Sequence, residues 1–170
     1  VKANSHAHIE NSDITGSSSG YEAIWLWNNG SIMLQGTSSV TAPSGTSAIS
    51  LTTASSAVIN DDVQINSVDQ TAIYMDKNSV VELNDNVAIT RSDGNDEIFV
   101  DPTSALRING SDITLANVGC EGITSYVQVG NNNSVNISNT CNGYQNLIPN
   151  YVEIFTGNCE NNGKNFLLTR

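Results

Sequence analysis

The sequence predicts an all-β fold, namely a right-handed, single-stranded parallel β-helix with about 24–25 residues and three short strands per coil. Three observations predict it. A short apolar phrase recurs at a nearly fixed interval, apolar and polar residues alternate within each copy, and Ser, Thr, Asn, Asp and Gly separate the copies. The copies are Ala-Ile-Trp-Leu at 23–26, Ala-Ile-Ser-Leu at 48–51, Ala-Ile-Tyr-Met at 72–75, Glu-Ile-Phe-Val at 97–100 and Gly-Ile-Thr-Ser at 122–125.

The phrase defines the first strand of each coil. Its isoleucines, Ile24, Ile49, Ile73, Ile98 and Ile123, lie 25, 24, 25 and 25 residues apart. Two further sets of apolar residues keep nearly the same period and predict the second and third strands. The second-strand set is Ala7/Ile9, Ile32/Leu34, Ala57/Ile59, Val81/Leu83 and Leu106/Ile108, and the third-strand set is Ile14, Val40, Val63/Ile65, Val87/Ile89, Ile113/Leu115 and Val135/Ile137.

The constant phase of these sets predicts a common interior. In a strand, every other side chain points to the same side. Strands of three to five residues cannot bury an apolar face alone, so each coil is expected to lie on the previous one at the inter-strand spacing of about 4.8 Å. The aliphatic side chains of successive coils then stack in columns.

A polar position recurs between the second and third strands, at Glu10, Gln35, Asn60, Asn84 and Asn109. Asn tolerates the left-handed backbone conformation that a sharp corner needs, and stacked side-chain amides can hydrogen-bond along a ladder. We therefore expect the asparagines to turn this corner and to form a ladder.

The repeat weakens after Thr140, which predicts two parts: a parallel β-helix over residues 1–139 and an irregular C-terminal cap over 140–170. A cap is expected because the edge of the last coil would otherwise be unpaired. The three cysteines are Cys120, Cys141 and Cys159. Cys120 and Cys141 are nearly one period apart, so they are either bridged in an oxidising compartment or free thiols near the cap.

Charge and hydropathy exclude two classes of partner. The net charge is −11 with six Lys and Arg residues, so the field of the protein repels a phosphate backbone. No apolar window reaches the 18 residues of a membrane span. We expect neither nucleic-acid binding nor membrane insertion.

The period, the Ala-Ile-x-Leu phrase and the asparagine corner resemble those of the right-handed parallel β-helix, or pectin-lyase-like, superfamily. The resemblance covers about residues 5–139. Autotransporter adhesin passengers and phage tailspike domains are similar in these features. The resemblance implies an extracellular, cell-surface or virion-surface location, and tailspikes add the implication of a homotrimer.

The alternation also predicts which large side chains face outward. If Ile24 and Leu26 point inward, an aromatic stripe with neighbouring carboxylates lies on the outer wall. Its residues are Trp25, Trp27, Tyr74, Phe99, Asp76 and Asp101, in columns that also include Ser50, Thr52 and Thr124. Exposed aromatic patches mark interaction sites and can stack on sugar rings. The stripe could bind a cell-surface glycan or receptor. Alternatively, it is covered by another subunit, in a homotrimer or by lateral self-association, or by the protein's own loops.

Two acidic pairs are spaced by one coil: Asp76 with Asp101, and Asp61 with Asp85. Carboxylates on adjacent coils repel each other. A shared proton, a bound Ca²⁺ ion or splaying of the side chains into water would offset this repulsion. The first pair is the catalytic candidate and the second the calcium candidate, and a solvated face is the simpler interpretation of both. Arg107, one coil from Glu82, is interpreted as half of an ion pair.

These observations favour a non-enzymatic adhesion or receptor-binding module that holds a glycan on its aromatic stripe. One alternative is a tailspike-type polysaccharide depolymerase, a glycoside hydrolase or lyase, that uses outward Asp and Glu. The other is a structural spacer.

Overall fold

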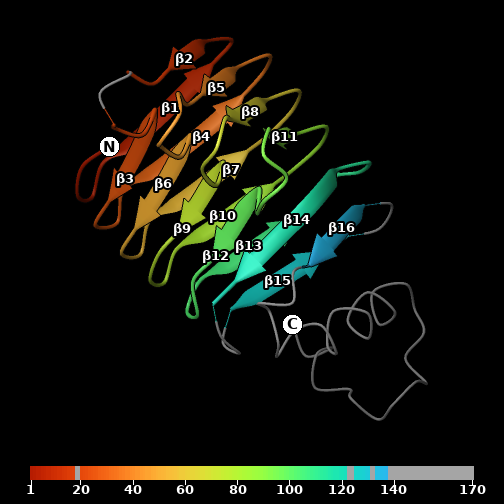
Figure 1. Ribbon diagram of the computed structural model, residues 1–170. Helices are drawn as coiled ribbons and strands as arrows, with labels where there is room; N and C mark the ends of the chain where they lie inside the picture. Colours follow the sequence, from red (N-terminus) through yellow and green to blue (C-terminus); the bar gives the residue numbers. More distant parts are fainter. Residues whose placement is uncertain (18–19, 122–124, 131–132, 138–170) are drawn as a thin grey trace.

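The computed structural model describes residues 1–17, 20–121, 125–130 and 133–137. These residues form sixteen strands and no helix. The strands pair in parallel in three sheets, and the chain winds through the sheets in turn as a β-solenoid of about five turns (Figure 1). The predicted parallel β-helix is confirmed.

Sheet A contains the second strand of each coil. Its strands, in spatial order, are β1 (His6–Glu10), β4 (Ser31–Gln35), β7 (Ser56–Ile59), β10 (Val80–Leu83), β13 (Ala105–Ile108) and β15 (Tyr126–Val129).

Sheet B contains the third strand of the first four coils. Sheet C contains the first strands and also Leu115, Val135 and Ile137, which the sequence had placed in the third-strand set. The strands of sheet B, in spatial order, are β11 (Ala88–Arg91), β8 (Gln64–Ser67), β5 (Ser39–Thr41) and β2 (Asp13–Thr15). Those of sheet C are β16 (Ser134–Ile137), β14 (Thr114–Cys120), β12 (Ile98–Val100), β9 (Ile73–Met75), β6 (Ile49–Thr52) and β3 (Ile24–Trp27).

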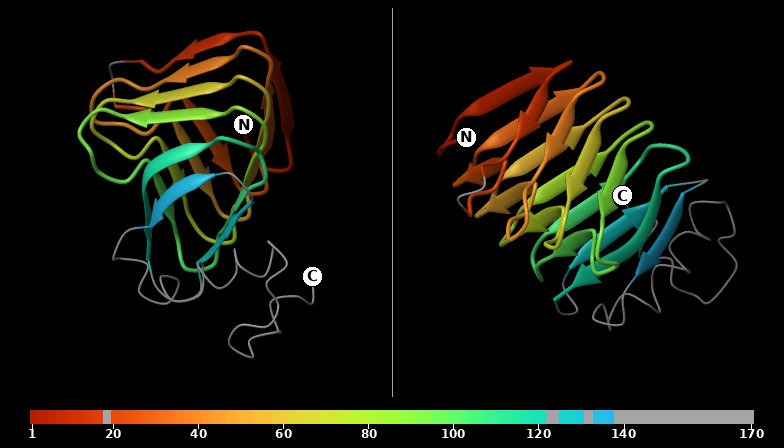
Figure 2. Two further views of the ribbon diagram at one scale, coloured as in Figure 1. Left: turned by 90° about the vertical axis from the view of Figure 1, so that its right-hand side faces the viewer. Right: turned by 45° about the horizontal axis from the view of Figure 1, so that its top comes forward.

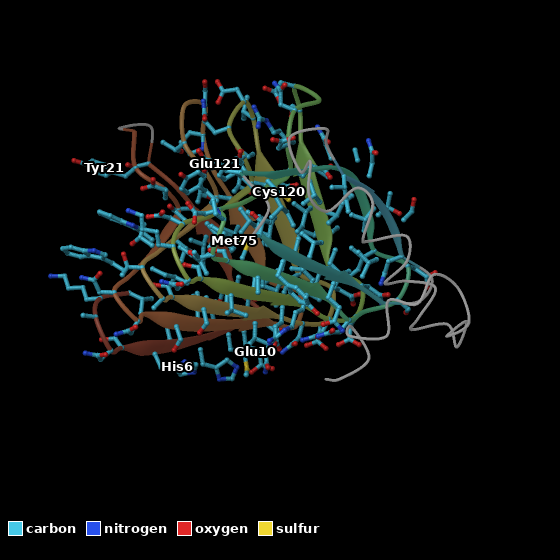
Figure 3. The ribbon with its side chains drawn as sticks, turned by 90° about the horizontal axis from the view of Figure 1, so that it is seen from below. His6, Glu10, Tyr21, Met75, Cys120 and Glu121 are labelled. Atoms are coloured by element: carbon cyan, nitrogen blue, oxygen red, sulfur yellow. The ribbon has the colours of Figure 1, made fainter. Side chains whose placement is uncertain are left out.

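The core consists of the predicted aliphatic columns. Equivalent isoleucines are register partners: Ile24 pairs with Ile49, Ile49 with Ile73, and Ile73 with Ile98. Successive strands lie side by side along the whole described stack (Figure 2), and Met75 lies in the interior (Figure 3). Each fully buried aliphatic side chain contributes about 1.5–3 kcal/mol.

The prediction for the fifth coil is wrong. Ile98 pairs with Val118, Phe99 with Gly119 and Val100 with Cys120, so this coil is only 20 residues long at that position. The phrase at 122–125 was expected there, but its residues 122–124 lie outside the described residues.

The fifth coil is short because one corner is missing. β14 runs directly from a third-strand position into sheet C, with Ala116 and Asn117 at the bend. Glu97 provides the hydrogen-bond acceptor for the backbone N–H groups at this bend. Its Oε2 accepts hydrogen bonds from the Ala116 N–H at 2.7 Å and the Asn117 N–H at 3.5 Å. Near the end of β14, Gly119 lies against the Asp96 carboxylate, which would have to move to make room for a Cβ.

The predicted asparagine ladder is present at the corner between sheets A and B. Asn84 Nδ2 donates to Asn60 Oδ1 at 2.9 Å, and Asn109 Nδ2 donates to Asn84 Oδ1 at 3.1 Å. The predicted backbone role is wrong, because none of these three residues has a positive φ.

The left-handed conformation lies one position later, at Asn11 (φ 49°), Gly36 (φ 67°), Asp61 (φ 58°) and Asp85 (φ 56°). At Gly36 the positive φ favours glycine, and a Cβ there would require the Asn11 side chain to shift. At this corner, one residue therefore forms the amide ladder, and the next residue adopts the left-handed conformation that turns the chain.

The corner between sheets C and A is built on buried serines that the sequence analysis did not identify: Ser55, Ser79, Ser104 and Ser125. Ser55 Oγ donates to the Thr52 carbonyl at 2.6 Å, and Ser125 Oγ donates to the Val100 carbonyl at 3.0 Å. These bonds satisfy carbonyl groups that the corner removes from water.

The predicted cap at 140–170 lies outside the described residues, as do Cys141 and Cys159. Cys120 is buried at the end of β14 and is disulfide-bonded.

Replacing the middle residue of the ladder tests its contribution. Asn84→Ala removes two side-chain hydrogen bonds and should lower the free energy of unfolding by about 1–2 kcal/mol in urea denaturation. Asn86→Ala is the matched control, because Asn86 makes one exposed bond of 3.3 Å, to Asp62, and should cost less than about 0.5 kcal/mol. Equal losses for the two variants would contradict a stabilising ladder.

Candidate functional site

The outer face of sheet C holds two stacked aromatic pairs. Trp25 and Trp27 lie two positions apart on β3, with ring centroids 5.8 Å apart and an interplanar angle of 15°. Tyr74 on β9 and Phe99 on β12 are register partners, with centroids 5.3 Å apart and an angle of 3°. We call these four side chains the aromatic platform.

The platform follows from the alternation within each strand. Ile24 and Leu26 are buried on β3, so the two tryptophans between and after them point outward and are each 47% exposed. Tyr74 is 37% exposed and Phe99 is half-buried. The outward orientation predicted for all four rings is confirmed.

Ser50 links the two pairs. It is the register partner of Trp25 on one side and of Tyr74 on the other, and it also points outward. It is nevertheless only 6% exposed. Ser50 is therefore a small, buried residue between the two aromatic pairs.

A column of carboxylates runs beside the platform. The backbone N–H groups of Asp76, Asp101 and Glu121 continue the sheet C ladder by donating to the carbonyls of Leu51 (2.9 Å), Met75 (3.0 Å) and Val100 (3.1 Å). These three residues occupy the same outward position on successive coils, in line with Thr52 and Trp27. We call Asp76, Asp101 and Glu121 the acidic column.

The acidic column lies close enough to Tyr74 to affect its phenol. Burial raises the pKa of Tyr74, and the negative charges of Asp76, Asp101 and Glu121 raise it further. Asp101 Oδ1 also accepts weak hydrogen bonds from the Thr103 N–H (3.3 Å) and Oγ1 (3.4 Å). The structure therefore brings the predicted residues Tyr74, Asp76 and Asp101 together.

Glu121 is the member that the sequence analysis missed. The 25-residue period assigned the column's next positions to residues around Thr124, whereas the short fifth coil places Gly119 beside Phe99. A local signal does exist: Met-Asp at 75–76, Val-Asp at 100–101 and Cys-Glu at 120–121 are three apolar–acidic pairs.

The calcium candidates Asp61 and Asp85 lie at the A–B corner, away from sheet C. Asp61 Oδ2 accepts a hydrogen bond from the Gly36 N–H at 2.9 Å, which gives this carboxylate a role in the turn. Within the described ranges, no group of three or more His, Cys, Asp and Glu side chains is arranged to hold a metal ion.

Arg91 organises the loops between sheets B and C. Its Nη2 donates to the Asp69 carbonyl and to Asp93 Oδ2, both at 2.7 Å, and its Nη1 donates to the Asp96 carbonyl at 3.0 Å. The hydrogen bond from Arg91 is the main cause that holds the pKa of Asp93 below its usual range. These contacts fix loop shape and do not form part of the platform.

Further outward polar groups lie on sheet A. Arg107 Nη1 lies 2.6 Å from Glu82 Oε1, which confirms the predicted ion pair. His6 Nδ1 shares a hydrogen bond of 2.9 Å with Ser31 Oγ. Figure 3 shows His6 and Glu10 together on the outer side of this sheet.

Comparison with known proteins assigns no family: no protein-family model, curated protein or solved structure matches the chain. In the part of the chain that the structure describes, no helix has the length and apolar character needed to cross a membrane.

Truncating a platform ring tests its outward position. Trp25→Ala should change the free energy of unfolding by less than about 1.5 kcal/mol, because the ring is half exposed and loses mainly its stacking on Trp27. Leu26→Ala, the neighbouring core residue, should cost about 2–5 kcal/mol. Thermal or urea unfolding of both variants measures this, and an equal loss would mean that the ring is packed inside.

The Arg91–Asp93 pair predicts a pH dependence. A carboxyl with a lowered folded-state pKa stabilises the protein above its ordinary pKa of 3.8 and loses that contribution as pH falls through the lowered value. Asp93→Asn should therefore lose less stability than the native chain on acidification below about pH 4. Urea midpoints across that range give the comparison, and parallel curves for the two proteins would contradict it.

Proposed function

We propose that this chain is a non-enzymatic glycan-binding module of an extracellular, cell-surface or virion-surface protein, and that sugar rings stack on the aromatic platform. In this proposal it is an adhesion or receptor-binding element with the coil pattern of pectin-lyase-like β-helices. The observation that carries the proposal is the pair of stacked, solvent-exposed aromatic groups on one outer sheet face.

The chemistry of the surface suits sugars. Aromatic faces bind the apolar faces of sugar rings, and carboxylates and hydroxyls beside them accept hydrogen bonds from sugar hydroxyl groups. Trp25, Trp27 and Tyr74 offer exposed aromatic rings, while the acidic column and Thr52 supply polar atoms one position away. A rigid sheet holds these groups in fixed positions, which lowers the entropy lost on binding.

Charge argues against a second copy of the chain as the occupant. The acidic column lies beside the rings, and the chain carries a net charge of −11. Bringing two such faces together places like charges opposite each other, which is unfavourable at low ionic strength. A homotrimer or lateral association through this face is therefore the weaker explanation, and a spacer needs no exposed aromatic groups.

One observation favours an enzyme as the second candidate. Asp76 and Asp101 occupy equivalent positions on adjacent coils, about 4.8 Å apart along the stack. Retaining glycosidases place their two carboxyl groups about 5–5.5 Å apart. In this alternative, the same platform would hold a glycan that the two carboxyl groups cleave.

A glycan-array screen followed by calorimetry on the hits tests the proposal. Trp25→Ala and Tyr74→Ala should each weaken binding about tenfold, since a stacking contact contributes about 0.5–1.5 kcal/mol beyond its buried area. Tyr126→Ala is the matched control, because Tyr126 lies on β15 in sheet A, and it should bind like the native chain.

Three outcomes are decisive. Binding that survives both platform substitutions, or the absence of any glycan ligand, would reject the proposal. Release of new reducing ends from a bound glycan, stopped by Asp76→Asn or Asp101→Asn, would replace it with the enzyme.

A further inference from the structure

The acidic column makes the platform chemically uneven. Along one outward line of sheet C, the residues change from Trp27 and Thr52 to Asp76, Asp101 and Glu121. The Trp25–Trp27 pair is thus flanked by the Thr52 hydroxyl group, and the Tyr74–Phe99 pair by three carboxylates. A ligand that spans the platform therefore meets the three carboxylates only at its Tyr74–Phe99 end.

The negative charge of the column is not balanced within the described residues. The two ion pairs found there, Arg91–Asp93 and Arg107–Glu82, lie in a loop and on sheet A. Lys77 follows Asp76 in the chain, but it is exposed and forms no ion pair in the described part of the structure. Like charges on neighbouring coils repel, and a bound cation relieves this repulsion.

The ring next to the column favours the same kind of ligand. A cation over the face of Tyr or Phe is attracted by the ring's quadrupole, and nearby carboxylates add to this attraction. Tyr74 is the exposed ring of its pair, and Asp76, Asp101 and Glu121 all act on its phenol. An ammonium group beside Tyr74 would be attracted both by the ring and by the carboxylates.

We infer that the glycan held by the platform is an amino sugar with free ammonium groups, placed with an ammonium group at Tyr74 and the acidic column. This inference rests on the proposed glycan-binding function and names its ligand class. Sugars that carry carboxylates or sulfates are excluded by repulsion from the column. A glycan fits better than a basic peptide because the column lies beside the exposed rings of Trp25, Trp27 and Tyr74, which a lysine chain held by charge alone does not need.

Calorimetry with two oligosaccharides of equal length tests the inference. The probes are an oligomer of β-1,4-linked glucosamine and its fully N-acetylated form, which differ in charge and in the acetyl group. The native chain should bind the glucosamine oligomer about tenfold more tightly at low salt. This preference should shrink as ionic strength rises from about 0.01 M to about 1 M, where the Debye length falls from about 30 Å to about 3 Å.

Matched variants locate the effect. Asp76→Asn with Asp101→Asn and Glu121→Gln removes the charges of the column, keeps the side-chain shapes and should abolish the preference. Glu10→Gln with Asp85→Asn and Asp112→Asn makes the same change in net charge at exposed positions outside sheet C, and should keep the preference. Circular dichroism and the melting temperature confirm that both triple variants are folded.

The outcomes separate this inference from the proposed function. If both oligomers bind with equal affinity, or if both triple variants lose the preference alike, the ammonium inference fails while glycan binding stands. If neither oligomer binds, and no other glycan does, the proposed function fails as well. Oligolysine that binds as tightly as the glucosamine oligomer, and still does so in Trp25→Ala and Tyr74→Ala, would overturn the inference in favour of charge attraction alone.

Discussion

The in-register parallel stacking of one coil on the next is the constraint from which the other features of this protein follow. Each coil is too small to bury its own apolar residues, so the aliphatic side chains are removed from water only when equivalent positions align. A slip of one residue would turn the Ile24 column outward and the Trp25 column inward. The register therefore fixes both the core and every outward column.

The candidate site is a direct result of this stacking. Trp25 and Trp27 share a face because they are two positions apart on one strand, and Tyr74 and Phe99 stack because they are register partners on adjacent coils. The acidic column arises in the same way, from three apolar–acidic pairs that end successive strands. Side chains that are distant in sequence thus form a surface whose geometry is as fixed as the sheet itself.

The period was sufficient to predict the strands of the first four coils, the aliphatic columns, the outward rings and the Asn84 ladder, because all of these depend on alternation and phase. The parts that were not predicted depend on local backbone geometry. Whether Asn84 or the following Asp85 takes the left-handed conformation is decided by the corner, and a phase argument does not distinguish them. The short fifth coil depends on Glu97 accepting two N–H groups at a bend, and Glu121 joins the acidic column only because that coil is short.

The register can be tested directly with introduced cysteine pairs on the outer face of sheet A. Ser31 and Ser56 are register partners on adjacent coils, so their Cα atoms lie about 4.8 Å apart, within the range of about 4.4–6.8 Å that a disulfide spans. Ser31 and Val80 are two coils apart, at roughly twice that spacing. Mass mapping after mild oxidation should find a disulfide in the Ser31→Cys, Ser56→Cys chain and none between positions 31 and 80 in the Ser31→Cys, Val80→Cys chain. A bridge in the second chain, with none in the first, would contradict the stacking and the outer surface derived from it.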